Sequence, residues 1–519
     1  MRIHQEEGKY YLERNFPTPA SLWIDSTPST SYPSLVGDTN VDVAIIGGGM
    51  TGITTAYLLA QGGLKTVVLE AERILLGTTG HTTGKLTVQH NLIYDYLLKQ
   101  IGEENSKLYA EANRAAIEFV AETIRREDIQ CDFSRQSAYL YTQKRRHIKA
   151  LEKEFEVACK LGIQAYLVED IPLDLPVKGA LRFDNQAQFH PRKYLLALAE
   201  RFIAQGGNIY EQTKVVDIRG KGPFIVHTES GAKIKADYVI MACHYPFHIL
   251  PGFYVAKIYQ EREYAIVVKA KEKFPGGMYV NVEDPPRSLR GLPTPEEDRI
   301  LIVGERHRTG TGKNLTEHYK NLMKFAQGLF TVEDFPFHWS TQDCSTLDDI
   351  PYIGPVSKDK PNLLMATGYR KWGMTHSTVA ALLLRDGILE GKSPWEEVYS
   401  PSREGNLKSK TRFVFNTGDL VYHFVGGKLK KGEKEYSLSP GEAVIANIKG
   451  RRGGIYKDRE GKLHIVDTTC THLGCELQWN DGELSWDCPC HGSRYDIDGN
   501  PLHGPTLKPL KKIRLDKLE

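Results

Sequence analysis

Four residues near the C-terminus have the types and the spacing of metal ligands. They occur in two short sequences, Cys470-Thr-His472 and Cys488-Pro-Cys490-His491. Two thiolates and two imidazoles can bind a [2Fe–2S] centre, with both histidines on one iron, and the same four groups can bind a structural zinc ion. Zinc leaves Cys475, Cys490 and the tight Pro-Cys-His-Gly-Ser turn unexplained. The pattern therefore favours an iron–sulfur centre and electron transfer, with zinc as the alternative.

The segment 433–519 as a whole resembles Rieske [2Fe–2S] domains. The resemblance implies two pairs of iron ligands: Cys470 with Cys488, and His472 with His491. It resembles the high-potential members, in which the two remaining motif cysteines, here Cys475 and Cys490, form a disulfide. Ser493 and Tyr495 match the hydroxyl groups that donate to a cluster sulfide and to a ligand thiolate. Such donors raise the potential, so we expect a value in the upper half of the Rieske range of about −150 to +300 mV.

A second chemically informative sequence, near the N-terminus, could bind a dinucleotide. An apolar run at 41–46 leads into the G-x-G-x-x-G sequence of Gly47, Gly49 and Gly52, and residues with helical apolar spacing follow. A second apolar run at 66–69 ends in Glu70. The glycines allow a pyrophosphate to approach the N-terminus of a helix, and the acidic side chain can bind a ribose hydroxyl. The strand–turn–helix context therefore predicts a dinucleotide-binding βαβ unit.

The surrounding segments resemble the D-amino-acid oxidase/glycine oxidase family, which implies FAD as the dinucleotide. The likeness covers about residues 20–400 and is weakest over 135–340, where such enzymes recognise substrate. It implies further FAD contacts from three parts of the chain: Thr79, His81, Thr83, Gly84, Val215, Gly368, Gly373, Met374 and Thr375. The sequence around His81 also resembles dimethylglycine dehydrogenases, in which a histidine is bonded covalently to the flavin. A non-covalent histidine beside the pyrophosphate is the alternative.

Catalytic residues are harder to assign, because oxidation of a C–N bond by flavin needs little acid–base chemistry beyond a neutral amine. Arg370, Lys371 and His376 lie in the segment expected near the flavin ring. A cation there could stabilise reduced flavin or hold a substrate carboxylate, although a solvated or salt-bridged charge is an alternative for each. Further candidates for the substrate pocket are Trp339, Tyr264 and Arg290.

These motifs require elements that position them, and together they predict an α/β architecture. We expect an N-terminal extension (1–40) and a Rossmann-type FAD-binding domain with an interleaved α+β substrate domain (41–400). A polar linker (401–432), with a bridging helix near Phe413, would lead to an all-β Rieske domain (433–519).

Composition describes an ordinary globular chain of 519 residues with a formal net charge of +2. This charge gives no reason to expect a nucleic-acid partner. No apolar run reaches eighteen residues, so we expect no transmembrane segment, and the N-terminal sequence favours a cytoplasmic location. The remaining cysteines are scattered and are expected to be buried thiols: Cys131, Cys159, Cys243 and Cys344. A disulfide in a reducing compartment would be unusual unless it is shielded beside a cluster.

The two motifs together predict an enzyme that oxidises a C–N bond of a small amine or amino acid. Electrons would leave FAD through the [2Fe–2S] cluster to a separate acceptor, either a protein or a quinone. Alternatives are an NAD(P)H-driven reductase, for which no second G-x-G-x-x-G after a strand is present, and a redox-sensing module. A Rieske oxygenase would need a mononuclear iron site that the sequence does not suggest. A basic group, comprising Lys508, Lys511, Lys512 and Arg514, is either a solvated face or a contact for an acidic electron partner.

Overall fold

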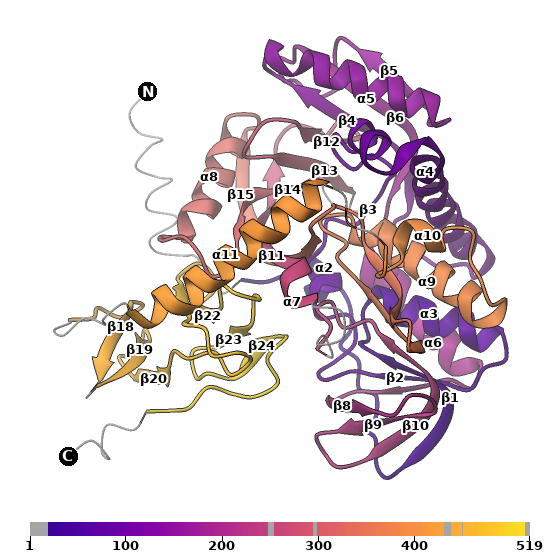
Figure 1. Cartoon of the computed structure of the whole chain (residues 1–519). Helices are drawn as coiled ribbons and strands as arrows, with labels where there is room; N and C mark the ends of the chain where they lie inside the picture. The colour runs from indigo at the N-terminus through magenta and orange to yellow at the C-terminus, as the bar shows by residue number, and fades with distance from the viewer. Residues whose placement is uncertain are drawn as a thin grey trace.

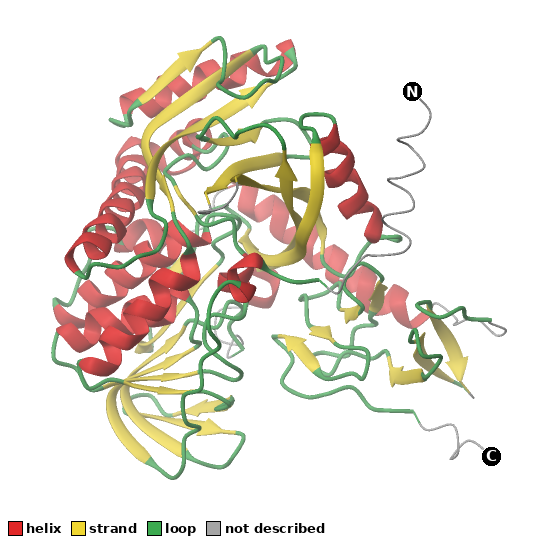
Figure 2. Cartoon of the chain, turned by 180° about the vertical axis from the view of Figure 1, so that it is seen from behind, coloured by secondary structure: helices red, strands yellow, loops and turns green. Residues whose placement is uncertain are grey.

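The computed structural model describes residues 19–247, 254–293, 298–403, 405, 407–429, 437–448 and 450–513. Arg514 of the basic group and residues 1–18 of the N-terminal extension lie outside this part. The described chain forms a nucleotide-binding layer, a substrate-side sheet and a C-terminal β region, and one long helix, α11, runs between the last two (Figure 1). Helices cover one side of the nucleotide-binding layer, whereas the C-terminal region consists of short strands and loops (Figure 2).

The nucleotide-binding layer is an eight-stranded sheet with a parallel centre. The strands of its main path are, in spatial order, β16 (Tyr352–Ser357), β17 (Lys360–Thr367), β10 (Lys233–Met241), β1 (Thr39–Ile46), β2 (Thr66–Leu69) and β7 (Asn208–Tyr210). The hairpin of β8 (Val215–Arg219) and β9 (Phe224–Thr228) extends β10. The helices α3 (Met50–Gln61), α6 (Pro191–Ala204) and α9 (Gly373–Leu389) pack beside one another. Strands from three distant parts of the chain thus assemble the sheet, as expected for an interleaved Rossmann-type domain.

The substrate-side sheet has nine strands and is mostly antiparallel. Along its main path lie β15 (Val332–Thr346), β11 (Ile258–Ala270), β14 (Asp298–Arg308), β13 (Arg287–Pro293), β12 (Met278–Asn281), β4 (Ser134–Thr142), β6 (Gly179–Gln188) and β3 (Lys85–Leu86). Strand β5 (Ala165–Val168) pairs with β6. The helices of this region are α4 (Tyr94–Arg126), α5 (Ile148–Lys160) and α8 (Thr316–Gln327). Helix α8 buries its apolar face against β11 and β14, so that alternate residues of those strands face the helix or the flavin side.

The C-terminal region contains two small antiparallel sheets. One comprises β18 (Ala443–Ile448), β19 (Arg451–Lys457) and β20 (Leu463–Asp467). The other comprises β21 (Gln478–Asn480), β22 (Ser485–Asp487), β23 (Arg494–Tyr495) and β24 (Pro501–His503). The two Cys/His sequences form the loops between β20 and β21 and between β22 and β23. The all-β prediction for this region is therefore confirmed.

Short elements complete the description. They are α2 (Leu22–Asp25), η1 (Thr78–His81), η2 (Arg145–His147), α7 (Tyr254–Lys257) and α10 (Glu396–Tyr399). The described part of the N-terminal extension packs on the loop around η1, here called the flavin-side loop, since Trp23 Nε1 donates to the Thr82 carbonyl at 2.6 Å. Cys131 and Cys344 are buried as predicted, but Cys159 is exposed on α5 and Cys243 is half-buried. The exposure of Cys159 follows from the orientation of α5, whose buried positions are Leu151, Glu154, Val157 and Ala158.

Helix α11 (Leu407–Leu429) occupies most of the predicted linker. It is the expected bridging helix, and Asn416 anchors it by donating to the Ala256 carbonyl at 2.9 Å. Several of its apolar residues are largely solvent-exposed rather than packed between the domains: Val414, Phe415, Val421 and Tyr422. No helix within the described residues is long and apolar enough to cross a membrane.

Candidate functional site

The glycine-rich turn after β1 is tight enough to require glycine. A Cβ atom at Gly52 would lie 1.9 Å from the Gly47 carbonyl oxygen, and one at Gly47 would lie 2.6 Å from the Ala242 carbonyl oxygen. Gly49 is the N-cap of α3 and has no side chain to satisfy the first amides of the helix. An open helix N-terminus behind a glycine cradle is the geometry that accepts a pyrophosphate. This part of the chain therefore fits the phosphate end of FAD.

The predicted FAD contacts converge from three distant segments. The Met50 amide donates to Thr79 Oγ1 at 3.1 Å, and the Thr87 amide donates to Thr375 Oγ1 at 3.0 Å. Thr51 Oγ1 lies 2.9 Å from the hydroxyl of Tyr369. The turn after β1, the loop around η1 and the start of α9 thus form one cradle, in which Met374 and Thr375 are buried.

The remaining predicted contacts lie along the edges of this cradle. Glu70 Oε2 accepts the Gly48 amide at 2.7 Å, and burial raises the pKa of this carboxyl. Val215 begins β8, two residues after Thr213, whose amide donates to the Glu70 carbonyl at 2.8 Å. A Cβ at Gly368 would lie 2.3 Å from a Thr346 methyl group, so the loop before α9 also needs glycine.

Buried polar atoms without a partner mark the flavin-ring end of the cradle. They lie next to β3 and at the start of α9: Gln89 Nε2, His90 Nε2, Asn91 Oδ1 and Trp372 Nε1. Buried polar atoms are normally hydrogen-bonded, so such a group indicates a ligand with several acceptors and donors. An isoalloxazine ring has both, and the residues present therefore fit the cofactor.

A small cavity of about 50 Å³ lies beside these atoms and is lined by charged side chains of the substrate-side sheet and of the loop before α9. Lys85 of β3 is buried and contacts the Ser288 hydroxyl, and burial lowers its pKa to about 7. Lys371 pairs with Glu263 of β11, and burial lowers its pKa to about 8. Among the described residues, no ion pair joins Lys85 to a carboxylate. The cavity can therefore offer an unneutralised cation to a ligand.

Arg290 supports the wall of this cavity rather than opening into it. Its guanidinium donates to the carbonyls of Thr83 and Gly84, at 2.9 and 2.7 Å. Burial lowers its pKa to about 9, and its charge in turn lowers the pKa of Lys85.

Only one of the three predicted catalytic residues lines the cavity, namely Lys371. Arg370 faces Asp349, with an N–O distance of 3.6 Å. His376 is buried in α9, and its Nε2 lies 3.1 Å from the hydroxyl of Tyr109. The structure thus places Arg370 and His376 in supporting networks around the cradle.

The two aromatic pocket candidates do not line the cavity either. Tyr264 alternates with Glu263 along β11 and therefore faces α8, where it packs against Tyr319. Trp339 lies under the flavin-side loop, and its Nε1 donates to the His81 carbonyl at 3.0 Å. The imidazole of His81 lies over the same loop, with Nδ1 at 2.9 Å from the Gly77 carbonyl.

The cysteines and histidines of the C-terminal region converge in two facing loops. Cys475 and Cys490 form the predicted disulfide, with Cα atoms 6.6 Å apart. Cys470 and Cys488 are both buried beside it, and the rings of His472 and His491 lie 5.1 Å apart. His491 is buried, yet neither of its ring nitrogens has a partner. Two buried thiols beside a pair of neighbouring imidazoles, of which that of His491 is unsatisfied, fit a [2Fe–2S] cluster with mixed ligands.

Hydroxyl groups lie beside the thiols as the resemblance implies. The Tyr495 hydroxyl is 3.3 Å from Cys470 Sγ and accepts the Thr471 amide at 3.1 Å. The hydroxyl of Ser493 is buried and accepts the Thr506 amide at 3.2 Å. The loop around residue 505 is thereby fixed against the cluster loops.

The cluster loop between β22 and β23 is in direct contact with the flavin-containing half. Gln342 of β15 donates from Nε2 to the Gly492 carbonyl at 2.9 Å. The Gln342 carbonyl accepts the Thr78 hydroxyl at 3.3 Å, and Thr78 belongs to the flavin-side loop. A Cβ at Gly310 would lie 2.4 Å from the Pro489 nitrogen, so these two segments of the chain meet backbone to backbone. A single residue thus bridges the loops that would hold the two cofactors.

Charged contacts fix the C-terminal region in this position. Asp481 accepts the Leu315 amide at 2.7 Å and so caps α8, which has no side-chain cap of its own. Glu483 accepts the Tyr319 hydroxyl at 2.6 Å and lies 3.7 Å from Arg262, whose side chain is fully buried. These residues were not singled out in the sequence, because their partners lie more than 160 positions away.

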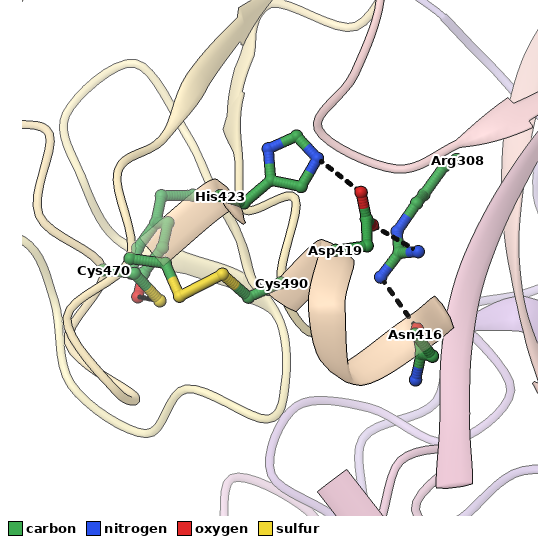
Figure 3. The surroundings of a disulfide bond; sticks show 8 residues. Arg308, Asn416, Asp419, His423, Cys470 and Cys490 are labelled. Carbon is green, nitrogen blue, oxygen red and sulfur yellow. Dashed lines mark hydrogen bonds and ion pairs between the residues drawn. A yellow bond between two sulfur atoms is a disulfide. The ribbon is translucent and has the colours of Figure 1, made fainter. Parts of the chain in front are cut away.

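Beside the disulfide, α11 adds a further set of contacts. Arg308 of β14 pairs with Asp419 at 2.6 Å and donates to Asn416 at 3.1 Å, and Asp419 also contacts His423 (Figure 3). Helix α11 is therefore fixed to β14 beside the disulfide.

The fold and the two sites define a flavin-dependent oxidoreductase fused to an iron–sulfur domain. A family model described as FAD dependent oxidoreductase (DAO) matches residues 42–386, and the Rieske [2Fe-2S] domain model matches residues 431–514. The chain belongs to the DAO family of FAD-dependent oxidoreductases and carries a C-terminal Rieske domain. Its cofactors are accordingly FAD and a Rieske-type [2Fe–2S] cluster.

Relatives of known sequence and structure agree with this assignment. A Bacillus subtilis (strain 168) protein that bears the name Rieske 2Fe-2S iron-sulfur protein YhfW is 44% identical over 96% of this chain and 98% of its own length. Iron-sulfur subunit 1 of the cytochrome b6-f complex from Synechocystis is 41% identical over 19% of this chain and 57% of its own. Glycine oxidase from Geobacillus kaustophilus shares the fold, with a TM-score of 0.60, 20% identity, and coverage of 71% of this chain and all of its own.

Proposed function

We propose that the enzyme oxidises a C–N bond of a small amine or amino acid and delivers the electrons through its own Rieske cluster to a separate acceptor. The observation that carries this proposal is the Gln342 bridge between the flavin-side loop and the cluster loop. When bound, FAD supplies the two-electron acceptor and the cluster a one-electron carrier. The residues that would hold the cluster are Cys470, Cys488, His472 and His491.

The cavity supports a substrate that carries an anionic group. Lys85 brings a positive charge that no described carboxylate neutralises, whereas Lys371 is already paired with Glu263. Burial disfavours the charged form of the Lys85 amine, and a substrate carboxylate beside it would stabilise that form. Solved structures of similar fold include glycine oxidase and an L-amino acid deaminase, and γ-glutamylputrescine oxidoreductase of Escherichia coli (strain K12) is 29% identical over 39% of this chain. These names are consistent with an amino-acid or amine substrate.

A substrate screen tests the dehydrogenase assignment. Amino acids and the amines that correspond to them without the carboxylate are added to the oxidised enzyme in the absence of oxygen, and the flavin absorbance is followed. We expect bleaching by a subset of amino acids. Rapid bleaching by NADH alone would instead favour the reductase alternative, and no bleaching by any amine would favour the redox-sensing module. The cytoplasmic location stays a prediction, which cell fractionation tests.

One variant assayed with a matched pair of substrates separates the role of Lys85 from a general effect on the fold. Lys85→Met removes the charge and keeps the length of the side chain, so KM for an amino acid should rise at least tenfold while KM for the corresponding amine changes little. Equal changes for both compounds would show that Lys85 does not hold a carboxylate.

A further inference from the structure

The outer face of α11 carries two pairs of exposed apolar side chains, here called the outer stripe, with the exposed Gly418 between them. Val414, Phe415, Val421 and Tyr422 are 70%, 73%, 56% and 63% exposed. Residues seven and eight positions apart fall on the same face of a helix, so the four side chains form one stripe about 12 Å long. Single exposed apolar residues are ordinary, but a row of them on one helix face indicates a binding surface.

The stripe cannot turn inward, because the opposite face of α11 is fixed to both domains. Asn416 donates to the Ala256 carbonyl at 2.9 Å, and Asp419 pairs with Arg308 at 2.6 Å. Leu420 packs against the core of the Rieske domain. Figure 3 shows Asn416 and Asp419 turned toward Arg308, on the side of the helix that faces the protein. The helix therefore lies flat on the molecule with its apolar side outward.

The stripe ends beside the loop that carries His472. The Phe424 ring comes within 3.9 Å of the Cβ position of Gly474, and the neighbouring Leu473 is 52% exposed. His491 of the cluster site is buried against Tyr245, at 6.3 Å between the rings, whereas His472 is only half-buried. The apolar surface is thus continuous with the more exposed histidine of the cluster site.

Exposed lysines flank this surface. Lys410 lies one helical turn before Val414, and Lys508 is held next to the cluster loop because its carbonyl accepts the Thr471 hydroxyl at 2.7 Å. The acidic residue of this part of the helix, Asp419, is already neutralised by Arg308. Apolar side chains with cations at the edge are the composition of a helix that lies in the interface of an anionic membrane.

We propose that the outer stripe and Leu473 attach the enzyme peripherally to the surface of a bilayer that contains anionic lipid. The helix would lie in the membrane plane without crossing it, with its apolar side chains in the headgroup region. This attachment would place the His472 side of the cluster site at the membrane surface, where lipid-soluble electron acceptors are found. The proposal concerns the surface alone and does not depend on which substrate the flavin oxidises.

A second copy of the chain is a less suitable occupant of the stripe. Aromatic side chains bury about 150–250 Å² each, so these partly exposed residues offer roughly 500 Å². A standard protein interface needs about 800 Å² from each partner. A dimer formed through the stripe would also cover the cluster loop at Leu473, whereas a membrane surface leaves that loop facing the phase that holds the acceptor.

Sedimentation of the full-length holoenzyme with vesicles tests the proposal without any turnover. The protein is mixed with vesicles of phosphatidylglycerol and phosphatidylcholine, or of phosphatidylcholine alone, and the pelleted fraction is measured at low and high salt. We expect binding to the anionic vesicles that weakens as salt screens the lysines. Phe415→Ser combined with Tyr422→Ser should lower the partition coefficient about tenfold or more, since two aromatic side chains lose their apolar burial.

The matched control is Leu463→Ser, which removes an exposed apolar side chain of β20 away from the stripe. This variant should pellet like the unmodified enzyme, and all variants should retain flavin absorbance and the cluster EPR signal. An enzyme that stays in the supernatant with anionic vesicles would overturn the proposal, as would equal pelleting of the stripe variant. Dissociation of a dimer by the stripe variant, seen by light scattering, would assign the stripe to a second copy instead.

Discussion

Replacing Glu483 by glutamine should loosen the Rieske domain from the flavin-containing half. The Glu483 carboxylate accepts the Tyr319 hydroxyl at 2.6 Å and lies 3.7 Å from the guanidinium groups of Arg262 and Arg494. Arg494 keeps a second carboxylate, Asp487, at 3.0 Å. Arg262 is fully buried, and two of its nitrogens have no hydrogen-bond partner. The charge of Arg262 therefore depends on acidic groups of the other domain.

The geometry sets the expected size of the effect. At 3.7 Å the attraction between Glu483 and Arg262 is about 4 kcal/mol for an effective dielectric constant of about 20. Removing one partner of a buried pair typically costs about 3–5 kcal/mol. Glutamine keeps the hydrogen bond from Tyr319, so we expect a loss of about 3 kcal/mol in the free energy of docking. Because about 1.4 kcal/mol is a factor of ten, the undocked population should rise about a hundredfold.

Urea unfolding and stopped-flow reduction measure this effect together. Glu483→Gln should unfold at lower urea and pass electrons from flavin to cluster more slowly, whereas Glu460→Gln, which changes an exposed acid of the same domain, should behave like the unmodified enzyme. Adding Arg262→Met to Glu483→Gln should recover part of the stability, because no buried charge is then left unpaired. Unfolding free energies of Glu483→Gln and Glu460→Gln that agree within about 0.5 kcal/mol would refute the reasoning.

Three further predictions concern the individual sites. Burial lowers the pKa of Lys85 to about 7, so the charge of its amine is present below that pH and lost above it. KM for an amino acid should therefore rise between about pH 6 and pH 8.5, and a Lys85→Met variant should lose this pH dependence. Tyr495→Phe should lower the cluster potential by roughly 65–130 mV in protein-film voltammetry, since a hydrogen bond to a charged group contributes about 1.5–3 kcal/mol and the cluster accepts one electron. An unchanged potential would exclude a role for the hydroxyl at 3.3 Å from Cys470. Gly52→Ala should abolish FAD binding, measured by absorbance after gel filtration, because its Cβ would lie 1.9 Å from the Gly47 carbonyl oxygen. The control is Gly179→Ala, where an added Cβ meets no atom within 4 Å. Flavin retained by Gly52→Ala would show that the turn is less constrained than described.

The sequence predicts those parts of the molecule that depend on local pattern. The turn from β1 into α3 and the two Cys/His loops each lie within a short stretch, and their spacing is itself the geometry of the site. The disulfide between Cys475 and Cys490 followed from a family resemblance and is present. The bridging helix was also predicted, although its exposed face was not.

Contacts between distant segments could not be predicted in the same way. Lys85 is visible next to Gly84, but its position in the cavity depends on Ser288, which is 203 residues away. Glu263 and Tyr264 are neighbours in the sequence and face opposite sides of β11, so the choice between them needs the position of α8. Docking residues such as Gln342 and Asp481 have no local signal, because their role exists only once the two domains are placed together.

The most direct test of the account is rapid freeze-quench EPR of the holoenzyme after anaerobic reduction of its flavin by an amino-acid substrate. Because Gln342 joins the flavin-side loop to the cluster loop within one chain, we predict that the signal of the reduced cluster appears as the flavin is reoxidised. The rate at which this signal appears should be independent of protein concentration. A reduced flavin that never yields the cluster signal, or a rate that rises in proportion to protein concentration, would contradict transfer within the chain.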